Sequence, residues 1–133
     1  IVVQAVGDDE FQKWVSVKEA EAVASSADAG KVWSRDDLMA RGEKVYAQCA
    51  ACHGATGAGS PGVFPALKGG KIATGPVDGH IGMVLRGRPG TVMQAYAGQL
   101  SDADIAAVVT YERNAFGNNT GDVVQPSAVK ALR

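Results

Sequence analysis

The chain has 133 residues, of which 46% are hydrophobic and 20% charged, and its formal net charge is −1 at pH 7. This is enough for one compact domain with an extension, and no apolar run approaches the roughly 18 residues of a membrane span. No internal repeat or nucleic-acid motif is present. The charge is uneven: residues 1–37 carry eight acids and four bases (−4), whereas residues 38–133 carry nine bases and six acids (+3). We therefore expect two segments of different structural origin.

The first 30 residues are predicted to form a strand, a helix and a linker. Residues 1–6 are rich in β-branched side chains, which is typical of a strand, but no partner strand follows. Asp8 is predicted to cap a helix with Phe11 and Trp14 at helical spacing. The stretch 19–30 is rich in Ala, Ser and acidic residues, and we expect it to end the helix and continue as a tether.

A second helix is predicted to begin at Ser34, which forms a capping-box pattern with Asp37. Its apolar stripe is predicted to run into a cysteine motif and consists of Leu38, Gly42, Val45 and Cys49. The glycine in this stripe would allow another helix to approach closely.

The cysteine motif, Cys49-Ala50-Ala51-Cys52-His53, is typical of covalent haem attachment. On a helical turn, residues three apart share a face, so both sulfurs can reach the vinyl groups of one porphyrin. His53 then lies under the ring, where its imidazole can bind the iron. The sequence therefore predicts one haem c.

Three other uses of these residues are less consistent with the sequence. A thioredoxin-like redox pair requires a βαβ context, which does not follow. A structural zinc site requires four ligands, and adjacent Cys52 and His53 cannot easily share one tetrahedral ion. A disulfide between Cys49 and Cys52 would not account for the histidine.

Residues 54–79 are predicted to form a long loop, because Gly and Pro recur throughout it. A loop of this length is unusual in a compact domain unless it wraps a bound group. Its apolar residues would face the porphyrin: Val63, Phe64, Leu67 and Ile72. A short apolar helix from His80 to Leu85 and a second loop from Arg86 to Thr91 are predicted to follow.

A second iron ligand is predicted at Met93, which lies in a loop that can place its thioether over the iron. Met39 lies on the helix leading into the motif and cannot reach the opposite haem face. Met83 lies among apolar residues and is expected to be core, and His80 is expected to be a hydrogen-bonded surface residue. The alternative for Met93 is a gap-filling core residue.

The last helix is predicted to begin at Ser101, which forms a capping box with Asp104, and to stop at Gly117. Its buried stripe is predicted to contain Ile105, Val108 and Val109. The tail from Asn118 to Arg133 is predicted to be polar and irregular.

The order of helix, Cys-x-x-Cys-His, Gly-rich loop, loop methionine and C-terminal helix resembles class I cytochrome c over residues 38–117. The resemblance implies an all-α fold wrapped around one haem, with Cys49 and Cys52 as thioethers, and His53 and Met93 as axial ligands. It also implies that the carbonyl of Pro65 orients the histidine. Gln94 stands where many relatives have proline.

The ends of the chain are similar to the fused cytochrome c form of bacterial cytochrome c oxidase subunit II. The N-terminal likeness lies in residues 1–6 and in Glu10, Phe11, Trp14 and Val15, and the C-terminal one in Arg113–Asn118 and Gly121–Pro126. The likeness implies that residues 1–30 are the end of a cupredoxin domain plus a linker, and that residues 31–133 are the cytochrome domain.

The resemblance implies one-electron transfer from a soluble or membrane-bound donor to the binuclear copper centre of the same subunit, next to the oxidase core. The domain would not be catalytic alone, and would lie on the periplasmic face of the bacterial cytoplasmic membrane. We expect the chain to be a mature or shortened form without its targeting segment or a membrane span. The alternatives are a free-standing periplasmic cytochrome c and a haem-based sensor or peroxidase with an open iron position.

Overall fold

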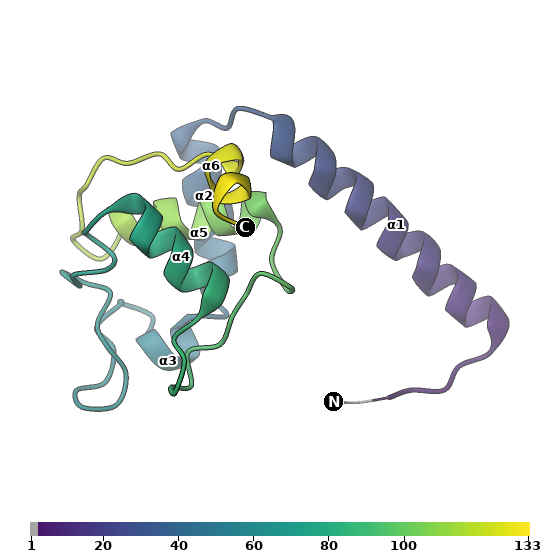
Figure 1. Cartoon of the computed structure of the whole chain (residues 1–133), viewed down its shortest axis with the longest axis horizontal. Helices are drawn as coiled ribbons and strands as arrows, with labels where there is room; N and C mark the ends of the chain where they lie inside the picture. Colours follow the sequence, from purple (N-terminus) through teal and green to yellow (C-terminus); the bar gives the residue numbers. More distant parts are fainter. Residues whose placement is uncertain (1–2) are drawn as a thin grey trace.

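The computed structural model describes residues 3–133, apart from the side chains of residues 21, 22, 24–27 and 29. Within these residues the chain forms α1 (Asp8–Gly30), α2 (Arg35–Tyr46), α3 (Ala50–His53), α4 (Val77–Arg86), α5 (Asp102–Asn114) and α6 (Pro126–Leu132) (Figure 1). The described part has no β-strand beyond an isolated bridge between Ser60 and Phe64. The all-α prediction is therefore confirmed for this part of the chain. None of the described helices is both long and apolar enough to cross a membrane.

The core is built where α2 packs against α5. Gly42 makes this possible: a Cβ atom there would lie 2.6 Å from the Cβ of Tyr111, and closer still to the carbonyl oxygen of Ala107. The predicted close approach of a second helix is thus confirmed. The core is completed from α4, and its fully buried side chains include Leu38, Ile81, Ile105, Val108 and Val109.

Both predicted serine caps are present. The Ser34 hydroxyl accepts a hydrogen bond from the Asp37 backbone N–H at 3.1 Å. At α5, Ser101 accepts from the Asp104 N–H at 3.1 Å, and the Asp104 carboxylate accepts from the Ser101 N–H at 3.2 Å. These reciprocal bonds satisfy backbone donors that a helix start leaves unpaired.

The N-terminal segment differs from the prediction. Residues 3–7 form no strand, and residues 1–2 lie outside the described part. The prediction that the helix ends within residues 19–30 is wrong, because α1 continues to Gly30 as one helix of 23 residues. Its many alanines are strong helix formers, and the acids of its first turn, including Asp8, interact favourably with the helix dipole. Asp8 is the first helical residue rather than the cap, which is Gly7.

The prediction of an irregular tail is correct for residues 118–125, which form no helix or strand, but wrong for the residues of α6. After Asn114 the chain turns back, and α6 packs against α5 with Val129 fully buried. Pro126 occupies the start of α6, where its missing N–H is not needed. The Gln125 side chain accepts from the Trp33 N–H at 2.9 Å and donates to its carbonyl at 3.0 Å. The tail is ordered because its few apolar residues reach the core.

Candidate functional site

The cysteine motif consists of Cys49, which is the N-cap of α3, and the four residues of α3. The preceding helix α2 ends at Tyr46 rather than continuing to Cys49 as predicted. The N–H groups of Cys52 and His53 donate to the Cys49 carbonyl at 3.1 and 2.9 Å, so the motif is one helical turn. Cys49 is half-buried and Cys52 exposed, and neither forms a disulfide. This turn fits the geometry that two bonds to one porphyrin require.

His53 is buried, with 8% of its surface exposed. Its Nδ1 lies 2.8 Å from the Pro65 carbonyl oxygen. A carbonyl oxygen only accepts, so Nδ1 carries the proton and the lone pair is on Nε2. Hydrogen bonding of one ring nitrogen to a carbonyl typically prepares the other nitrogen for a metal. The site residues His53 and Pro65 are thus brought together across the long loop.

The loop from Gly54 to Pro76 is held by backbone bonds to its own start. The N–H groups of Leu67 and Lys68 both donate to the Gly57 carbonyl, at 2.8 and 2.9 Å. Gly59 has φ +65°, and a Cβ there would lie 2.7 Å from the carbonyl carbon of Pro65. Glycine at this position therefore allows the turn that carries Pro65 back towards His53.

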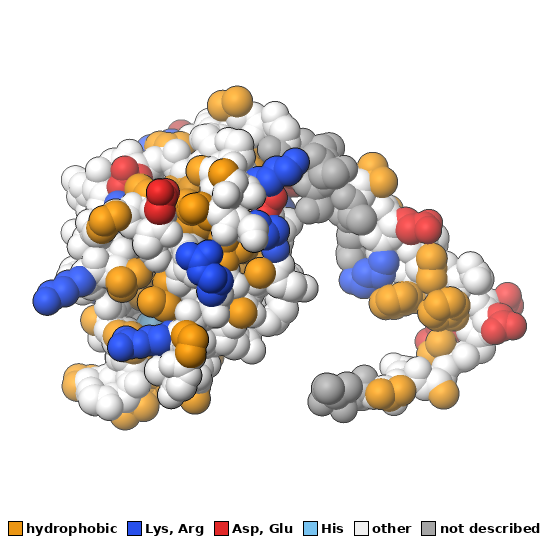
Figure 2. All heavy atoms as spheres, viewed as in Figure 1, with side chains coloured by type: hydrophobic (Ala, Val, Ile, Leu, Met, Phe, Trp, Pro, Cys, Tyr) orange, Lys and Arg blue, Asp and Glu red, His pale blue; other side chains and the backbone are white. Residues whose placement is uncertain are grey.

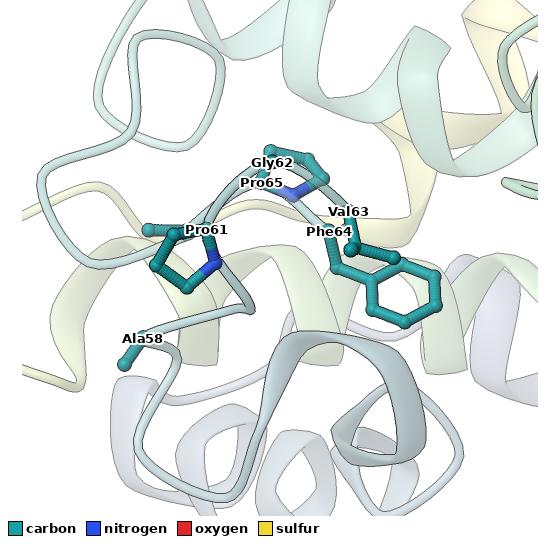
Figure 3. A pocket seen from close by; sticks show the side chains of 7 residues that line it. Ala58, Pro61, Gly62, Val63, Phe64 and Pro65 are labelled. Atoms are coloured by element: carbon teal, nitrogen blue, oxygen red, sulfur yellow. The ribbon is translucent and has the colours of Figure 1, made fainter.

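Within this loop, Ala58 and residues 61–66 line a shallow pocket of about 390 Å³ that is open to solvent. Figure 3 shows the side chains of Pro61 and Phe64 extending to opposite sides of the loop. Of the four apolar residues expected to face a porphyrin, Phe64 and Leu67 are half-buried, whereas Val63 and Ile72 are 68% and 46% exposed. An apolar surface of this kind fits contact with the edge of a large apolar ring.

Met93 is half-buried in the loop that connects α4 to α5. Its N–H donates to the Thr91 hydroxyl at 3.2 Å, and its carbonyl accepts from the Arg88 N–H at 2.9 Å. Downstream, the Tyr96 N–H donates to the Val84 carbonyl at 3.1 Å, which fastens the loop to α4. This loop and α3 reach the same end of the molecule (Figure 1). The distal-ligand role of Met93 remains a prediction.

His80 is buried, so the prediction of a surface histidine is wrong. Its Nε2 lies 2.8 Å from Glu112 Oε2. A signal was present in the sequence, since Glu112 continues the buried stripe of α5 at helical spacing from Val108 and Val109. A buried acid on such a stripe requires a partner.

Glu112 also affects two groups next to the cysteine motif. Burial, together with the nearby Glu112 carboxylate, raises the pKa of the Cys49 thiol to about 12. Burial and the same carboxylate raise the pKa of Tyr46 to about 12. The Tyr46 hydroxyl donates to the Gly54 carbonyl at 2.6 Å, immediately after His53. Both groups are therefore protonated at neutral pH.

The donor set fits haem rather than a bare metal ion. Within the described residues, no group of three or more His, Cys, Asp or Glu side chains could hold a metal ion. The zinc alternative therefore has no support in this part of the chain. Two cysteines on one turn that form no disulfide, a buried histidine whose Nδ1 carries the proton, and an apolar loop suit a covalently held porphyrin.

Comparison with known proteins agrees with this geometry. Residues 37–111 match the family described as "Cytochrome C oxidase, cbb3-type, subunit III". Cytochrome c-552 of Thermus thermophilus is 38% identical over 94 residues, covering 60% of this chain and 71% of that protein. A second cytochrome c-552, from a named strain of Thermus thermophilus, is also 38% identical over 94 residues. This match covers 60% of the present chain and 63% of that protein. The chain thus spans less than two thirds of the second relative. Because the family match covers more than half of the chain, the protein belongs to this family of cytochrome c domains, whose function is haem-based electron transfer.

Proposed function

We propose that this domain accepts one electron from an external donor and passes it to the binuclear copper centre of a haem–copper oxidase, on the periplasmic face of the membrane. The observation that carries the haem chemistry is the 2.8 Å contact between His53 Nδ1 and the Pro65 carbonyl, because it leaves Nε2 available to iron. The description of the matched family names an oxidase subunit, cbb3-type subunit III, which is a different subunit. The assignment to the copper centre therefore rests on the resemblance of both ends of the chain to subunit II.

In this proposal each site residue has a defined task. Cys49 and Cys52 would attach the haem through thioethers, and a nitrogen of His53 and the sulfur of Met93 would bind its iron. The haem supplies the reversible one-electron change of its iron. The chain contributes by holding both ligands in place: His53 through Pro65, and Met93 through the backbone bonds of its loop.

Covalent attachment is tested by extracting the protein with acid–acetone. Coordination bonds break under these conditions, whereas two thioether bonds survive, so we expect the colour to remain with the protein. A colourless protein after extraction would contradict haem c at Cys49 and Cys52.

The distal ligand is tested by Met93→Ala, with Met83→Ala as the matched control on α4. Loss of the thioether should abolish the far-red ferric band of bound methionine, lower the reduction potential, and open the iron to cyanide and carbon monoxide, because a thioether stabilises the ferrous state. Met83→Ala should keep the band. The reverse pattern would assign the ligand to α4, and an intact band in both variants would exclude both methionines. A sensor or peroxidase would already bind these ligands in the wild type.

A surface on α1 favours a domain that works next to a partner. Phe11 and Trp14 are 49% and 56% exposed, and their rings stack with centroids 6.0 Å apart. Figure 2 shows hydrophobic side chains on the side of α1 that faces the globular part, and acidic side chains on its outer side. Exposed aromatic pairs of this kind typically mark a contact surface. The exposed aromatic pair therefore supports a domain that lies beside a copper domain. The similarity to cytochrome c-552, in contrast, would favour a free-standing carrier.

The acceptor is tested by flash photoreduction of the haem in the intact subunit. Copper reduction should follow at a rate independent of protein concentration, because the linkage sets the effective concentration. The control is an equimolar mixture of the separate copper and cytochrome domains, where the rate should rise with concentration. Equal rates in the two samples would favour the free-standing carrier.

A further inference from the structure

A buried acid–imidazole pair lies beside the cysteine motif without attaching or ligating haem. His80 on α4 and Glu112 on α5 have side chains only 2% and 5% exposed, and the Nε2 and Oε2 atoms lie 2.8 Å apart. The Glu112 carboxylate is also close enough to Cys49 to contribute, after burial, to the raised pKa of its thiol. The carboxylate is therefore bonded to His80 and lies near a residue of the attachment site.

The hydrogen bonding of His80 assigns the protons of this pair. His80 Nδ1 is buried and has no hydrogen-bond partner within the described residues. If the ring were an imidazolium, or if the shared proton were on Glu112, Nδ1 would carry a buried N–H without an acceptor, which is costly. The arrangement that avoids this is a neutral ring that donates from Nε2 to an ionised carboxylate. Glu112 then carries a negative charge that His80 does not neutralise.

The described part of the chain supplies no cation to balance this charge at close range. Arg113, the next residue on α5, directs its guanidinium to Asp122 at 2.6 Å and to the carbonyls of Ala73 and Gly75. Tyr46 and Cys49, the other titratable groups that interact with Glu112, are neutral when protonated. A buried carboxylate with so little compensation requires an opposite charge nearby.

We propose that Glu112 is the buried counter-charge of the oxidised haem iron, with His80 as the neutral donor that holds the carboxylate in place. Ferric haem carries one positive charge more than ferrous haem, so a fixed negative charge beside it favours the ferric state. Glu112 therefore lowers the reduction potential of the site. The inference rests on haem attachment at Cys49 and Cys52, which acid–acetone extraction tests separately.

The test compares Glu112→Gln with Glu43→Gln in the haem-loaded protein by redox titration. Glutamine keeps the shape and an acceptor oxygen but removes the charge. At a fixed applied potential, Glu112→Gln should raise the ferrous-to-ferric ratio at least tenfold, which equals about 59 mV for one electron. Glu43 is an exposed acid on α2, so the same change there should alter the ratio less than twofold. A change below twofold in haem-loaded Glu112→Gln would overturn the proposal.

His80→Gln tests the proton assignment. Glutamine replaces one neutral donor by another, so the ferrous-to-ferric ratio should stay within threefold of the wild type. If His80 were cationic, its loss would leave Glu112 unopposed, and the ratio would move at least tenfold towards ferric. That outcome would overturn the neutral-donor assignment.

A measurement on the wild-type holoprotein covers the case in which Glu112→Gln does not retain haem. Oxidised-minus-reduced infrared spectra should contain an ionised-carboxylate band that shifts with the redox state and is altered by His80→Gln. If the band altered by His80→Gln were instead the carbonyl stretch of a protonated carboxyl group, Glu112 would be neutral and the proposal wrong.

Discussion

Two residues at the contact between α2 and α5 illustrate how single positions support the site. Gly42 lets the helix axes approach, and Asp104 joins them by accepting from Arg41 Nε at 2.8 Å. α2 leads directly into the cysteine motif, and α5 carries Glu112. Changes at this contact should therefore reach the haem site through the position of α2.

Gly42→Ala should destabilise the holoprotein. The added Cβ would meet the Ala107 carbonyl, which is backbone and cannot turn away. Overpacking of this kind costs about 1–3 kcal/mol, more than the roughly 0.5–1 kcal/mol that alanine contributes in a helix. Gly79→Ala on α4 is the control, since its Cβ would meet nothing within 4 Å and should leave stability equal or higher. Equal free energies of unfolding in denaturant for the two variants would contradict the steric account.

Asp104 should make stability depend on acid pH. Burial opposes ionisation of Asp104, but hydrogen bonds from Ser101 and Arg41 outweigh it and lower its pKa. A lowered pKa in the folded state means that the stabilisation is present above the unfolded value of about 4, and is lost as pH falls through the folded pKa. Asp104→Asn should thus be less stable than the wild type at pH 7, and the gap should narrow below about pH 4. Thermal melts from pH 7 to pH 2 measure the difference in stability between the wild type and Asp104→Asn, and the exposed Asp36→Asn variant is the control. A difference that does not change with pH would contradict the lowered pKa of Asp104.

At the scale of elements, α1 and α6 contribute differently to the globular part. α1 extends away from it in Figure 1, and near its end Asp28 pairs with Arg41 at 2.9 Å. The Trp33 indole donates to the Asp28 carbonyl at 3.2 Å. α6 instead packs on α5 and buries Val129. α6 is part of the cytochrome core, whereas the start of α1 is not.

Deletion of residues 1–26 should leave the visible spectrum and the melting temperature nearly unchanged. Phe11 and Trp14 are exposed, so their removal uncovers no core. Deletion of residues 1–30 also removes Asp28, and a partly exposed ion pair contributes about 0–1 kcal/mol, so a loss of a few degrees is expected. A loss of several degrees on removing residues 1–26 would instead show that the aromatic pair of α1 packs on the cytochrome.

At the scale of the whole molecule, charge separates the extension from the globular part. Lys and Arg side chains are spread over the face of the globular part seen in Figure 2. Four bases lie on the loops or helix ends predicted to border the haem: Lys68, Lys71, Arg86 and Arg88, all exposed. Arg86 also donates to the Leu132 carbonyl at 3.3 Å, so part of its role is structural. The other three are available to propionates or to a donor.

Oxidation of a charged soluble donor by the isolated domain should depend on ionic strength, because surface charge acts on the on-rate of a diffusing partner. Onward transfer to copper in the intact subunit should depend on it much less, because the linkage replaces diffusion. Stopped-flow measurement at low and high salt compares the two steps. Equal salt sensitivity would contradict a tethered acceptor, and an insensitive donor step would leave these bases as ordinary solvated charges.

The features that sequence alone determined are local. The serine caps, the turn of the cysteine motif and the apolar stripe that contains Gly42 depend on residues three or four apart. Such spacings can be recognised in a sequence because helix geometry is fixed. The haem motif is local for the same reason, and with the family match it was sufficient to establish haem-based electron transfer. The end of α1 and the whole of α6 were missed because propensity and apolar content are weak signals in short polar stretches.

Tertiary structure decided which distant residues meet. His80 and Glu112 are 32 positions apart, and Trp33 and Gln125 are 92 apart. Neither pair has a sequence signature, because each forms only after the loops have closed and the apolar faces of α2, α4, α5 and α6 have packed together. The stripe of α5 indicated that Glu112 is buried, but nothing in the sequence paired it with His80, which looked like an ordinary polar residue until packing enclosed both.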